Sequence, residues 1–261
     1  FLIRLGDCTL LLDCGSSSQK ELGRYTLEPL LLSRGIRRID AAFVSHSDLD
    51  HTSGLLYLLE EQERIPIHSL YLPKAALEDE SYRSLKEAFK DPAGIHYLSE
   101  GDSFFLKGKL RLSCLYEGRA PYPEANSHSP FLLLEYGDFR MAFTGDMTKG
   151  DEELLAKRLR QKGELPGAVT VYKAAHHGSR TSSSDAVLKL FSPEYALISY
   201  GPGNSYGHPH REVRERFLRY GAKLLETGER GQITLETDGR RLWIKSFLPR
   251  IEPVFFPWPV L

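Results

Sequence analysis

The sequence predicts a layered α/β protein whose helices cover the outer faces of its sheets. Short strands alternate with helices in both halves of the 261-residue chain, an order typical of layered α/β folds. The composition is that of an ordinary globular protein, with 41% hydrophobic residues, 26% charged residues and a formal net charge of −1. It excludes a disordered chain, a collagen-like fibre and a polybasic tail. No apolar run approaches the roughly 18 residues that span a bilayer.

The elements of the first half follow from hydrophobic periodicity and from the residues that form turns and end helices. Gly6-Asp7 predicts a hairpin turn, Gly35 ends a helix, and the Asp91-Pro92 pair ends another. The expected strands are 2–5, 9–14, 40–45 and 69–72, and the expected helices are 27–34, 53–61 and 75–89.

The second half alternates more strictly between strands and helices. Gly137-Asp138 predicts a two-residue hairpin turn between two of its strands. The expected strands are 104–106, 110–116, 131–136, 139–144, 169–174, 195–199, 223–226, 232–237 and 241–247. The expected helices are 151–161, 184–191 and 212–220.

We expect residues 1–261 to form a single domain, because no low-complexity linker divides the chain. The first residues have the pattern of a strand and lack the features of a signal peptide. They therefore indicate a piece of a longer protein. The proline-rich segment 249–261 is expected to be an extended carboxy-terminal arm.

Potential metal ligands are concentrated in short segments beside the predicted strands. The first segment follows the strand 40–45 and contains His46, Asp48, Asp50 and His51. The alternative is a polar helix start, in which Asp50 caps the helix. Two carboxylates crowded with two imidazoles gain nothing from such an arrangement unless they bind cations. The segment therefore favours a metal site that can serve two adjacent ions.

Later strand ends supply further candidates. Asp146 follows the strand 139–144, and Gly145 before it permits a close backbone approach. Its carboxylate could bridge two cations, or it could be a turn residue. His176 and His177 follow another strand, and adjacent side chains diverge, so one can ligate a metal while the other faces a substrate or a carboxylate.

The remaining histidines divide into functional and structural candidates. His208 could donate a proton or hold a phosphate, whereas His210 fits an exposed position in a helix first turn. His128 supplies either one more ligand or part of a polar turn. The last two, His68 and His96, are expected to be structural.

These segments, in this order, resemble the metallo-β-lactamase fold, whose signature is H-x-H-x-D-H after a strand. Here the signature is His46-x-Asp48-x-Asp50-His51, with aspartate in the second ligand place. Together with segments 144–146, 176–184 and 204–210, this variant resembles the C-terminal domain of ComEC-type DNA-uptake proteins over essentially the whole chain. The resemblance implies a four-layer αββα sandwich with the site at one edge between two sheets.

The site is expected to hold two divalent metal ions. The candidate ligands of one ion are His46, Asp48 and His128, those of the other are Asp50, His51 and His177, and Asp146 would bridge them. His176 or His208 would stabilise the phosphoryl group or protonate the leaving oxygen, and Asp50 is a further catalytic candidate. Aspartate at position 48 hardens the site and favours Mn²⁺, while Zn²⁺ stays open.

The resemblance implies a role in natural transformation. The domain would belong to a polytopic membrane protein, lie outside the bacterial cytoplasmic membrane, and degrade the DNA strand that is not imported. Its expected partners are single-stranded DNA and the transmembrane channel portion of the same protein. The oligomeric state stays open.

Two other functions stay open beside this one. The enzyme could act on a small phosphodiester such as a phosphocholine or nucleotide ester, or the chain could be a catalytically silent module that guides DNA. The net charge of −1 gives no bulk attraction to DNA. Three aromatic residues near predicted strand ends could stack on bases or fill the core, namely Tyr172, Tyr200 and Tyr206.

Overall fold

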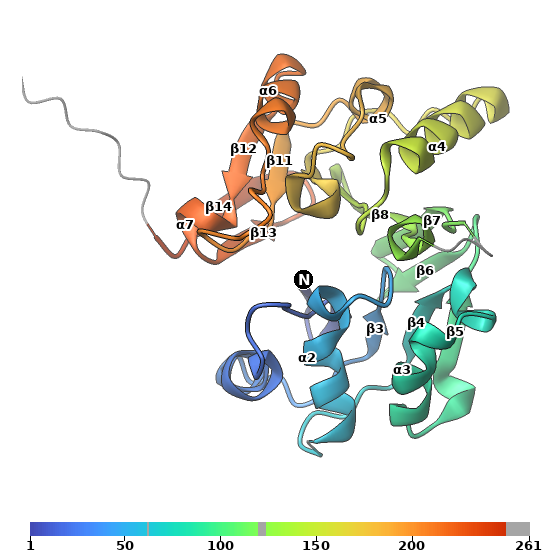
Figure 1. Ribbon diagram of the computed structural model, residues 1–261, viewed down its shortest axis with the longest axis vertical. Helices are drawn as coiled ribbons and strands as arrows, with labels where there is room; N and C mark the ends of the chain where they lie inside the picture. Colours follow the sequence, from blue (N-terminus) through green and yellow to red (C-terminus); the bar gives the residue numbers. More distant parts are fainter. Residues whose placement is uncertain (62, 120–123, 249–261) are drawn as a thin grey trace, which may run out of the picture.

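The computed structural model describes residues 1–61, 63–119 and 124–248. Two β-sheets face each other, and helices cover the outer face of each sheet (Figure 1). The predicted layered α/β architecture is therefore confirmed. The expected arm 249–261 lies outside the described residues.

The first sheet has five strands in the order β1-β2-β3-β4-β5. Its strands are β1 (Leu2–Leu5), β2 (Cys8–Leu12), β3 (Ala41–Phe43), β4 (Leu70–Pro73) and β5 (Ile95–Leu98). β1 and β2 form the predicted hairpin, and β2 to β5 run parallel. Parallel strands require crossover connections, and the main helices of these crossovers are α1 (Glu28–Ser33), α2 (Leu49–Glu60) and α3 (Arg83–Ala88).

The second sheet has seven strands in the order β12-β11-β10-β9-β8-β7-β6. Its antiparallel strands are β6 (Ser103–Leu106), β7 (Leu110–Tyr116), β8 (Phe131–Tyr136) and β9 (Phe139–Phe143). Parallel strands follow, namely β10 (Val171–Lys173), β11 (Tyr195–Ile198) and β12 (Lys223–Glu226). The associated helices are α4 (Lys149–Lys162), α5 (Asp185–Phe191) and α6 (Arg211–Arg219).

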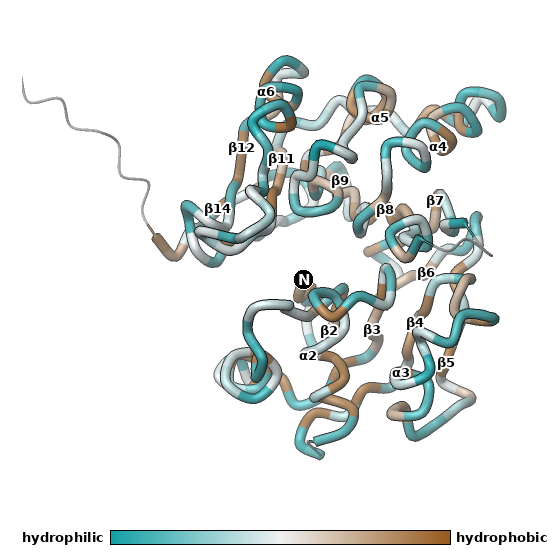
Figure 2. Tube along the Cα trace, in the orientation of Figure 1, coloured by the Kyte–Doolittle hydropathy of each residue, from teal (hydrophilic) through white to brown (hydrophobic). Residues whose placement is uncertain are grey.

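Three apolar clusters separate the four layers, as the alternation along β2 illustrates. Leu11 packs with Leu31 and Leu55 of the outer helices, whereas Leu10 and Leu12 belong to the cluster between the sheets. Successive side chains of a strand point to opposite faces, so one strand serves two cores. Figure 2 shows the resulting pattern, with hydrophobic residues along the strands and hydrophilic residues on the outer turns of the helices.

The predicted single helix 75–89 is wrong. The segment instead contains the short 3₁₀ helices η2 (Lys74–Leu77) and η3 (Glu80–Tyr82), followed by α3. The Asp79 carboxylate accepts the backbone N–H of Ser81 at 2.8 Å, and this local bond starts a new helix rather than continuing the old one.

Two further differences concern the first half of the chain. Strand β5 was not predicted, and it pairs with β4 along its whole length. Helix α2 begins at Leu49 rather than at residue 53, so Asp50 and His51 lie in its first turn. The remaining short helices are η1 (Gly23–Leu27), η4 (Pro92–Gly94), η5 (Ala125–His128), η6 (Ala175–Gly178) and α7 (Thr227–Arg230).

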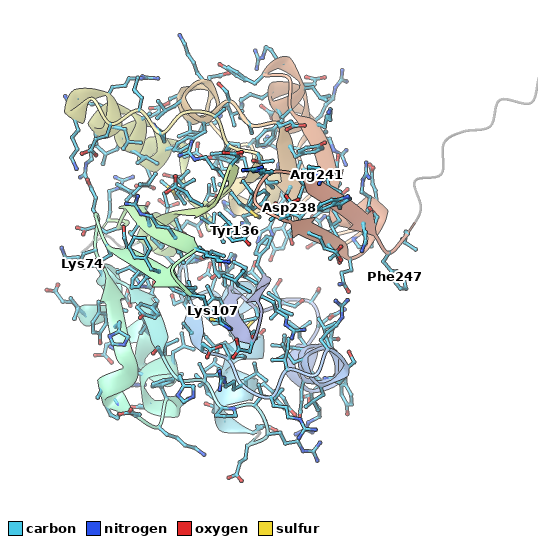
Figure 3. The ribbon with its side chains drawn as sticks, turned by 180° about the vertical axis from the view of Figure 1, so that it is seen from behind. Lys74, Lys107, Tyr136, Asp238, Arg241 and Phe247 are labelled. Carbon is cyan, nitrogen blue, oxygen red and sulfur yellow. The ribbon has the colours of Figure 1, made fainter. Side chains whose placement is uncertain are left out.

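A final hairpin, formed by β13 (Ile233–Thr237) and β14 (Leu242–Ser246), packs against the β8–β9 turn. The Asp138 N–H donates to the Gly239 carbonyl at 2.5 Å, and a Cβ on Gly137 would lie 2.6 Å from the same oxygen. The labels of Tyr136 and Asp238 mark this contact in Figure 3. The hairpin is therefore tied to the second sheet. In the part of the chain that the structure describes, no helix is long and apolar enough to cross a membrane.

A buried polar network lies behind the helices of the second sheet. The Glu152 carboxylate, in the first turn of α4, accepts the N–H groups of Ser183 at 2.9 Å and Ser184 at 2.5 Å. Arg216 of α6 donates to the carbonyls of Ser182 at 3.1 Å and Ser183 at 2.9 Å. The turn 182–184 is thus held from two sides.

We expect Glu152 to make the protein less stable as the pH rises from about 4.5 to about 7. Burial raises the pKa of this carboxyl to about 7 despite its hydrogen bonds. The folded state therefore keeps a proton that the unfolded state has already released, at a cost of up to about 3 kcal/mol. Glu152→Gln should flatten this decline in urea unfolding at several pH values in chelator. The exposed neighbour gives the control Glu153→Gln, which should retain it. An unchanged slope in Glu152→Gln would refute the assignment.

Candidate metal centre

Four chain segments bring histidine and aspartate side chains to one edge of the sandwich. His46 follows β3, and Asp50 and His51 lie in the first turn of α2. Asp48 stands at the N-cap of α2 without a capping hydrogen bond, so the sequence alternative of a polar helix start has no support from cap geometry. From the second sheet, Asp146 follows β9, and His176 and His177 follow β10.

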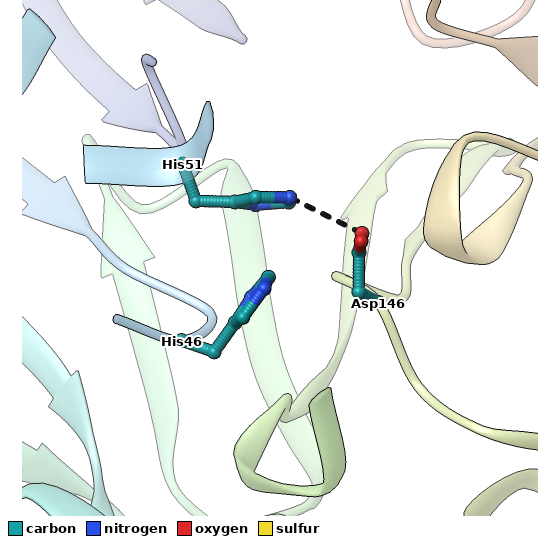
Figure 4. Close-up of side chains that lie close together, drawn as sticks. All are labelled: His46, His51 and Asp146. Carbon is teal, nitrogen blue, oxygen red and sulfur yellow. Dashed lines mark ion pairs between the residues drawn. The ribbon is translucent and has the colours of Figure 1, made fainter. Parts of the chain in front are cut away.

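Two groups of side chains could each hold a metal ion. The first is His46, His51 and Asp146, all buried, and the second is Asp50, His51 and His177. Within each group the ligand atoms lie within 4.8 Å of one another. His51 belongs to both groups, so the two positions are adjacent. Figure 4 shows His46 and His51 directed at Asp146.

The three histidines of these groups share one orientation. The Nδ1 atom of His46 lies 3.0 Å from Ser45 Oγ, that of His51 lies 3.1 Å from Asp13 Oδ2, and that of His177 lies 2.7 Å from the Ser199 carbonyl oxygen. A histidine whose Nδ1–H is held in this way presents the lone pair of Nε2. All three Nε2 atoms are buried and form no hydrogen bond among the described residues. The same is true of Asp146 Oδ1. Such atoms are costly to bury unless a cation binds them, so the residues present fit a metal ion.

Asp146 stands between the two groups. Its Oδ1 lies 3.2 Å from His51 Nε2, and its Oδ2 lies 3.7 Å from His177 Nε2 and 3.8 Å from His176 Nε2. Gly145 brings it there, because its φ of +50° suits glycine and a Cβ would lie 2.6 Å from Ser45 Cβ. The bridging role expected from the sequence stays a prediction, because Asp146 belongs to the first group only.

The charges of the site favour exchange of a proton for a cation. Burial lowers the pKa of His51, but the carboxylates of Asp146 and Asp13 outweigh burial and raise it to about 10. Burial likewise raises the pKa of Asp146, and His51 and Lys173 overcome this and hold it well below its usual range. Without a cation the carboxylates therefore keep a proton on His51. A divalent ion competes with this proton for His51, so the affinity of the site for the ion rises with pH.

The segment that carries His176 and His177 has a strained backbone. Their φ angles are +49° and +53°, in the left-handed region that costs a non-glycine residue about 1–2 kcal/mol. The neighbouring Gly178 has a φ of +83°, and a Cβ there would lie 2.5 Å from Pro209 Cβ. The strain turns both imidazoles toward Asp146, within the distances given above.

The structure places the other sequence candidates around the two groups but not in them. Asp48 is half exposed, and its Oδ2 lies 3.5 Å from His46 Nε2. His128 is buried, and its Nδ1 lies 3.3 Å from the Tyr82 hydroxyl and 3.8 Å from Asp79 Oδ2. His128 is therefore not brought to the ligand atoms of either group among the described residues.

His176 and His208 lie side by side at the edge of the site. Their ring centroids are 5.6 Å apart. Burial lowers the pKa of His176, and burial with the neighbouring His176 lowers that of His208 to about 4. Both rings are therefore neutral at pH 7, and each carries one N–H. His210 lies farther out, and its Nδ1 accepts the Arg180 N–H at 3.3 Å.

Two site residues were missed in the sequence. Asp13 follows β2 and orients His51, and the buried Lys173 donates to the Gly145 carbonyl at 2.8 Å and lies 3.5 Å from Asp146 Oδ1. Both stand at strand ends, which is the signal that identified the other candidates. No spacing rule in the sequence distinguishes either residue from an ordinary turn residue.

Two sheets packed face to face, with histidine and aspartate groups at one edge between them, define a class of metal-binding folds. The model of the metallo-beta-lactamase superfamily matches residues 1–201, and the chain belongs to this superfamily. The superfamily is usually hydrolytic and metal-dependent, in agreement with the two ligand groups.

Solved structures agree with this fold. The metallo-beta-lactamase fold protein YhfI from Bacillus subtilis has a TM-score of 0.53 at 15% identity, covering 86% of this chain and 86% of that chain. A variant of the CmlA beta-hydroxylase has a TM-score of 0.55 at 15% identity, covering 86% and 50%.

Among curated proteins, the chain is similar to ComE operon protein 3 of Bacillus subtilis, at 30% identity over 84% of this chain and 27% of the relative. It is also similar to competence protein ComA of Neisseria gonorrhoeae, at 32% identity over 89% and 30%. Recombination protein 2 of Haemophilus influenzae is 28% identical over 94% and 28%. The chain thus spans less than a third of the length of these relatives. The predicted resemblance to ComEC-type domains is confirmed.

Proposed function

We propose that the chain is a metal-dependent phosphodiesterase domain that acts on DNA during uptake and degrades the strand that is not transported. One observation carries the catalytic part of the proposal. Three imidazoles, each held through Nδ1, direct unpartnered Nε2 atoms toward the buried carboxylate of Asp146. The similarity to two proteins named for competence supports DNA as the substrate.

The proposal includes two divalent ions. His46 and Asp146 would hold one, and Asp50 and His177 the other, while the single Nε2 lone pair of His51 lies within reach of both positions and would serve one of them. Such ions supply Lewis acidity and charge neutralisation to phosphodiester hydrolysis. The aspartate oxygens favour Mn²⁺ and the imidazoles suit Zn²⁺, so the proposal covers both metals.

The chain's own residues would handle the protons and the phosphate. The nearby His177 lowers the pKa of Asp50 against the effect of burial, so Asp50 is an anion that can accept a proton from an attacking water. The neutral rings of His176 and His208 can donate N–H groups to phosphoryl oxygens.

The proposed partners are single-stranded DNA and the transmembrane channel portion of the same full-length protein. The proposed location is the outer face of the cytoplasmic membrane. Both are implied by the resemblance to ComEC-type DNA-uptake proteins, and the relatives extend well beyond the part that this chain matches.

The test is cleavage of end-labelled single-stranded DNA by the purified chain with Mn²⁺ or Zn²⁺. We expect Asp146→Asn to lower the rate by about 100-fold or more, because loss of even an outer partner of a metal ligand costs about 10- to 100-fold. The matched control is the exposed Asp138→Asn, which should cleave like the natural chain.

Two outcomes would overturn the proposal. Turnover of bis-p-nitrophenyl phosphate without any DNA cleavage would identify a small phosphodiester as the substrate class. DNA binding that survives Asp146→Asn, with no turnover by folded, metal-loaded protein, would identify a guiding module.

A further inference from the structure

Of the three tyrosines near the strand ends, Tyr206 alone is available to a ligand. Tyr172 is fully buried in the core of the second sheet. Tyr200 is half buried, and its hydroxyl donates to Glu226 at 2.8 Å. The Tyr206 side chain is 67% exposed. Exposure alone does not distinguish a binding residue from an ordinary surface residue. The contacts of the Tyr206 ring therefore decide between these two interpretations.

Stacked and edge-on rings connect Tyr206 with the metal centre. The Tyr206 and His208 rings are stacked, with centroids 5.7 Å apart and an interplanar angle of 23°. His208 meets His176 edge to face at 5.6 Å, and His176 Nε2 lies 3.8 Å from Asp146 Oδ2. The side chains of His208 and His176 therefore connect Tyr206 with the carboxylate of Asp146.

The loop that carries Tyr206 is clamped by one side chain. Asn204 Oδ1 accepts the His208 N–H at 3.0 Å, and Asn204 Nδ2 donates to the His208 carbonyl at 2.7 Å and the Gly201 carbonyl at 3.0 Å. These bonds close the loop 201–208 at both ends. A ring held in place before binding loses little conformational entropy when a ligand stacks on it.

The backbone of Arg180 lies beside the same loop. Arg180 is exposed, and its backbone N–H bonds the ring of His210, which packs edge to face on His208 at 5.1 Å. Within the described part of the chain its guanidinium forms no ion pair. A long cationic side chain that starts from this loop can reach a phosphate while the exposed ring meets the base, and proteins combine the two kinds of contact to bind single-stranded nucleic acids.

We propose that the outer face of Tyr206 stacks on an unpaired nucleobase, next to the phosphodiester bound at the metal centre. This inference rests on the proposed function and adds the residue that contacts an unpaired base. Bases in a duplex are covered on both faces by their neighbours and cannot stack on a side chain without being flipped out. The subsite therefore selects single strands.

The test measures how tightly the whole chain binds a fluorescent, phosphorothioate-linked oligothymidylate. Fluorescence anisotropy reports the binding, once with Mn²⁺ and once in EDTA. Phosphorothioate linkages slow hydrolysis, so binding is measured apart from activity. We expect Tyr206→Ala to weaken binding about 10-fold. Tyr206→Phe and Tyr206→Trp should bind like the natural chain, because they keep a ring. The control is Tyr25→Ala, since Tyr25 is 73% exposed and lies in η1.

A second probe isolates the base. Oligonucleotides in which abasic sites are placed one at a time keep every phosphate. We expect one position at which the abasic site weakens binding by the natural chain. The same abasic site should not weaken binding by the Tyr206→Ala variant any further. Equal binding by Tyr206→Ala, no detectable binding by the natural chain, or no abasic position that couples to Tyr206 would overturn the subsite. The proposed nuclease would survive those results if Asp146-dependent cleavage persists. If the coupling is found without cleavage, the subsite stands and the nuclease fails.

Discussion

Replacing His51 with alanine is expected to abolish tight binding of a divalent cation at one of the two positions of the site. His51 Nε2 is common to both ligand groups, and its Nδ1 is fixed by Asp13. No other residue of the described chain is common to both groups. Because an imidazole nitrogen has one lone pair, it binds one ion, and the substitution removes a ligand from that position. We expect the affinity to fall by more than about 100-fold, beyond the effect of losing an outer partner. The measurement is metal content and calorimetric stoichiometry after stripping with chelator and reloading with Mn²⁺ or Zn²⁺.

Two further variants make the result specific. His46→Ala should weaken only the position formed with Asp146, and His177→Ala only the position formed with Asp50. The exposed His68→Ala is the control and should load like the natural chain. Undiminished loading in His51→Ala would contradict a role of His51 as a ligand.

Replacing Gly15 with alanine is expected to destabilise the protein by about 3 kcal/mol or more and to weaken metal binding at the same time. A Cβ at this position would lie 2.3 Å from the Leu49 carbonyl oxygen, 2.6 Å from the Asp50 carbonyl carbon and 2.7 Å from the Thr52 nitrogen. All three are backbone atoms of the first turn of α2, so no side chain can move aside. Overpacking typically costs about 1–3 kcal/mol, and contact with fixed backbone lies at the upper end of that range.

The effect can be measured by thermal unfolding, where a loss of that size lowers Tm by roughly 6–12 °C for a domain of this length. The control is Gly201→Ala, because a Cβ at Gly201 meets nothing within 4 Å. The two variants change the same atoms in tight and in open surroundings. Similar melting temperatures for both would show that α2 can shift away from the loop after β2.

Local sequence signals were sufficient for most strands and for the segments that carry the site. His46, Asp50, His51, Asp146 and His177 were identified because each follows or precedes a strand, and strand ends meet at the edges of a sheet. The spacing of His46, Asp50 and His51 also matches a known signature, so the resemblance and the geometry point to the same side chains.

Contacts made only in three dimensions could not be predicted. Asp13 is far from His51 in the sequence and is distinguished only by its 3.1 Å contact with Nδ1. His128 has the residue type of a ligand, and the contacts of its Nδ1 with the Tyr82 hydroxyl and Asp79 are made only in the folded chain. The helix 75–89 is interrupted because the Asp79 side chain competes for a backbone N–H, an effect that hydrophobic periodicity does not register.

The position of the two ligand groups has a consequence for folding. The hydrogen bonds between strands run within each sheet, and apolar packing joins the two sheets. Both ligand groups include His51 from the first sheet's α2 and a residue that follows a strand of the second sheet, Asp146 or His177. A bound ion would therefore act as a cross-link between the two halves of the chain, closing long loops whose entropy the apolar core alone must otherwise offset. The two sheets could then separate at this edge only after the bonds between the ion and its ligands break. The supply of metal would therefore govern the rate at which the domain unfolds.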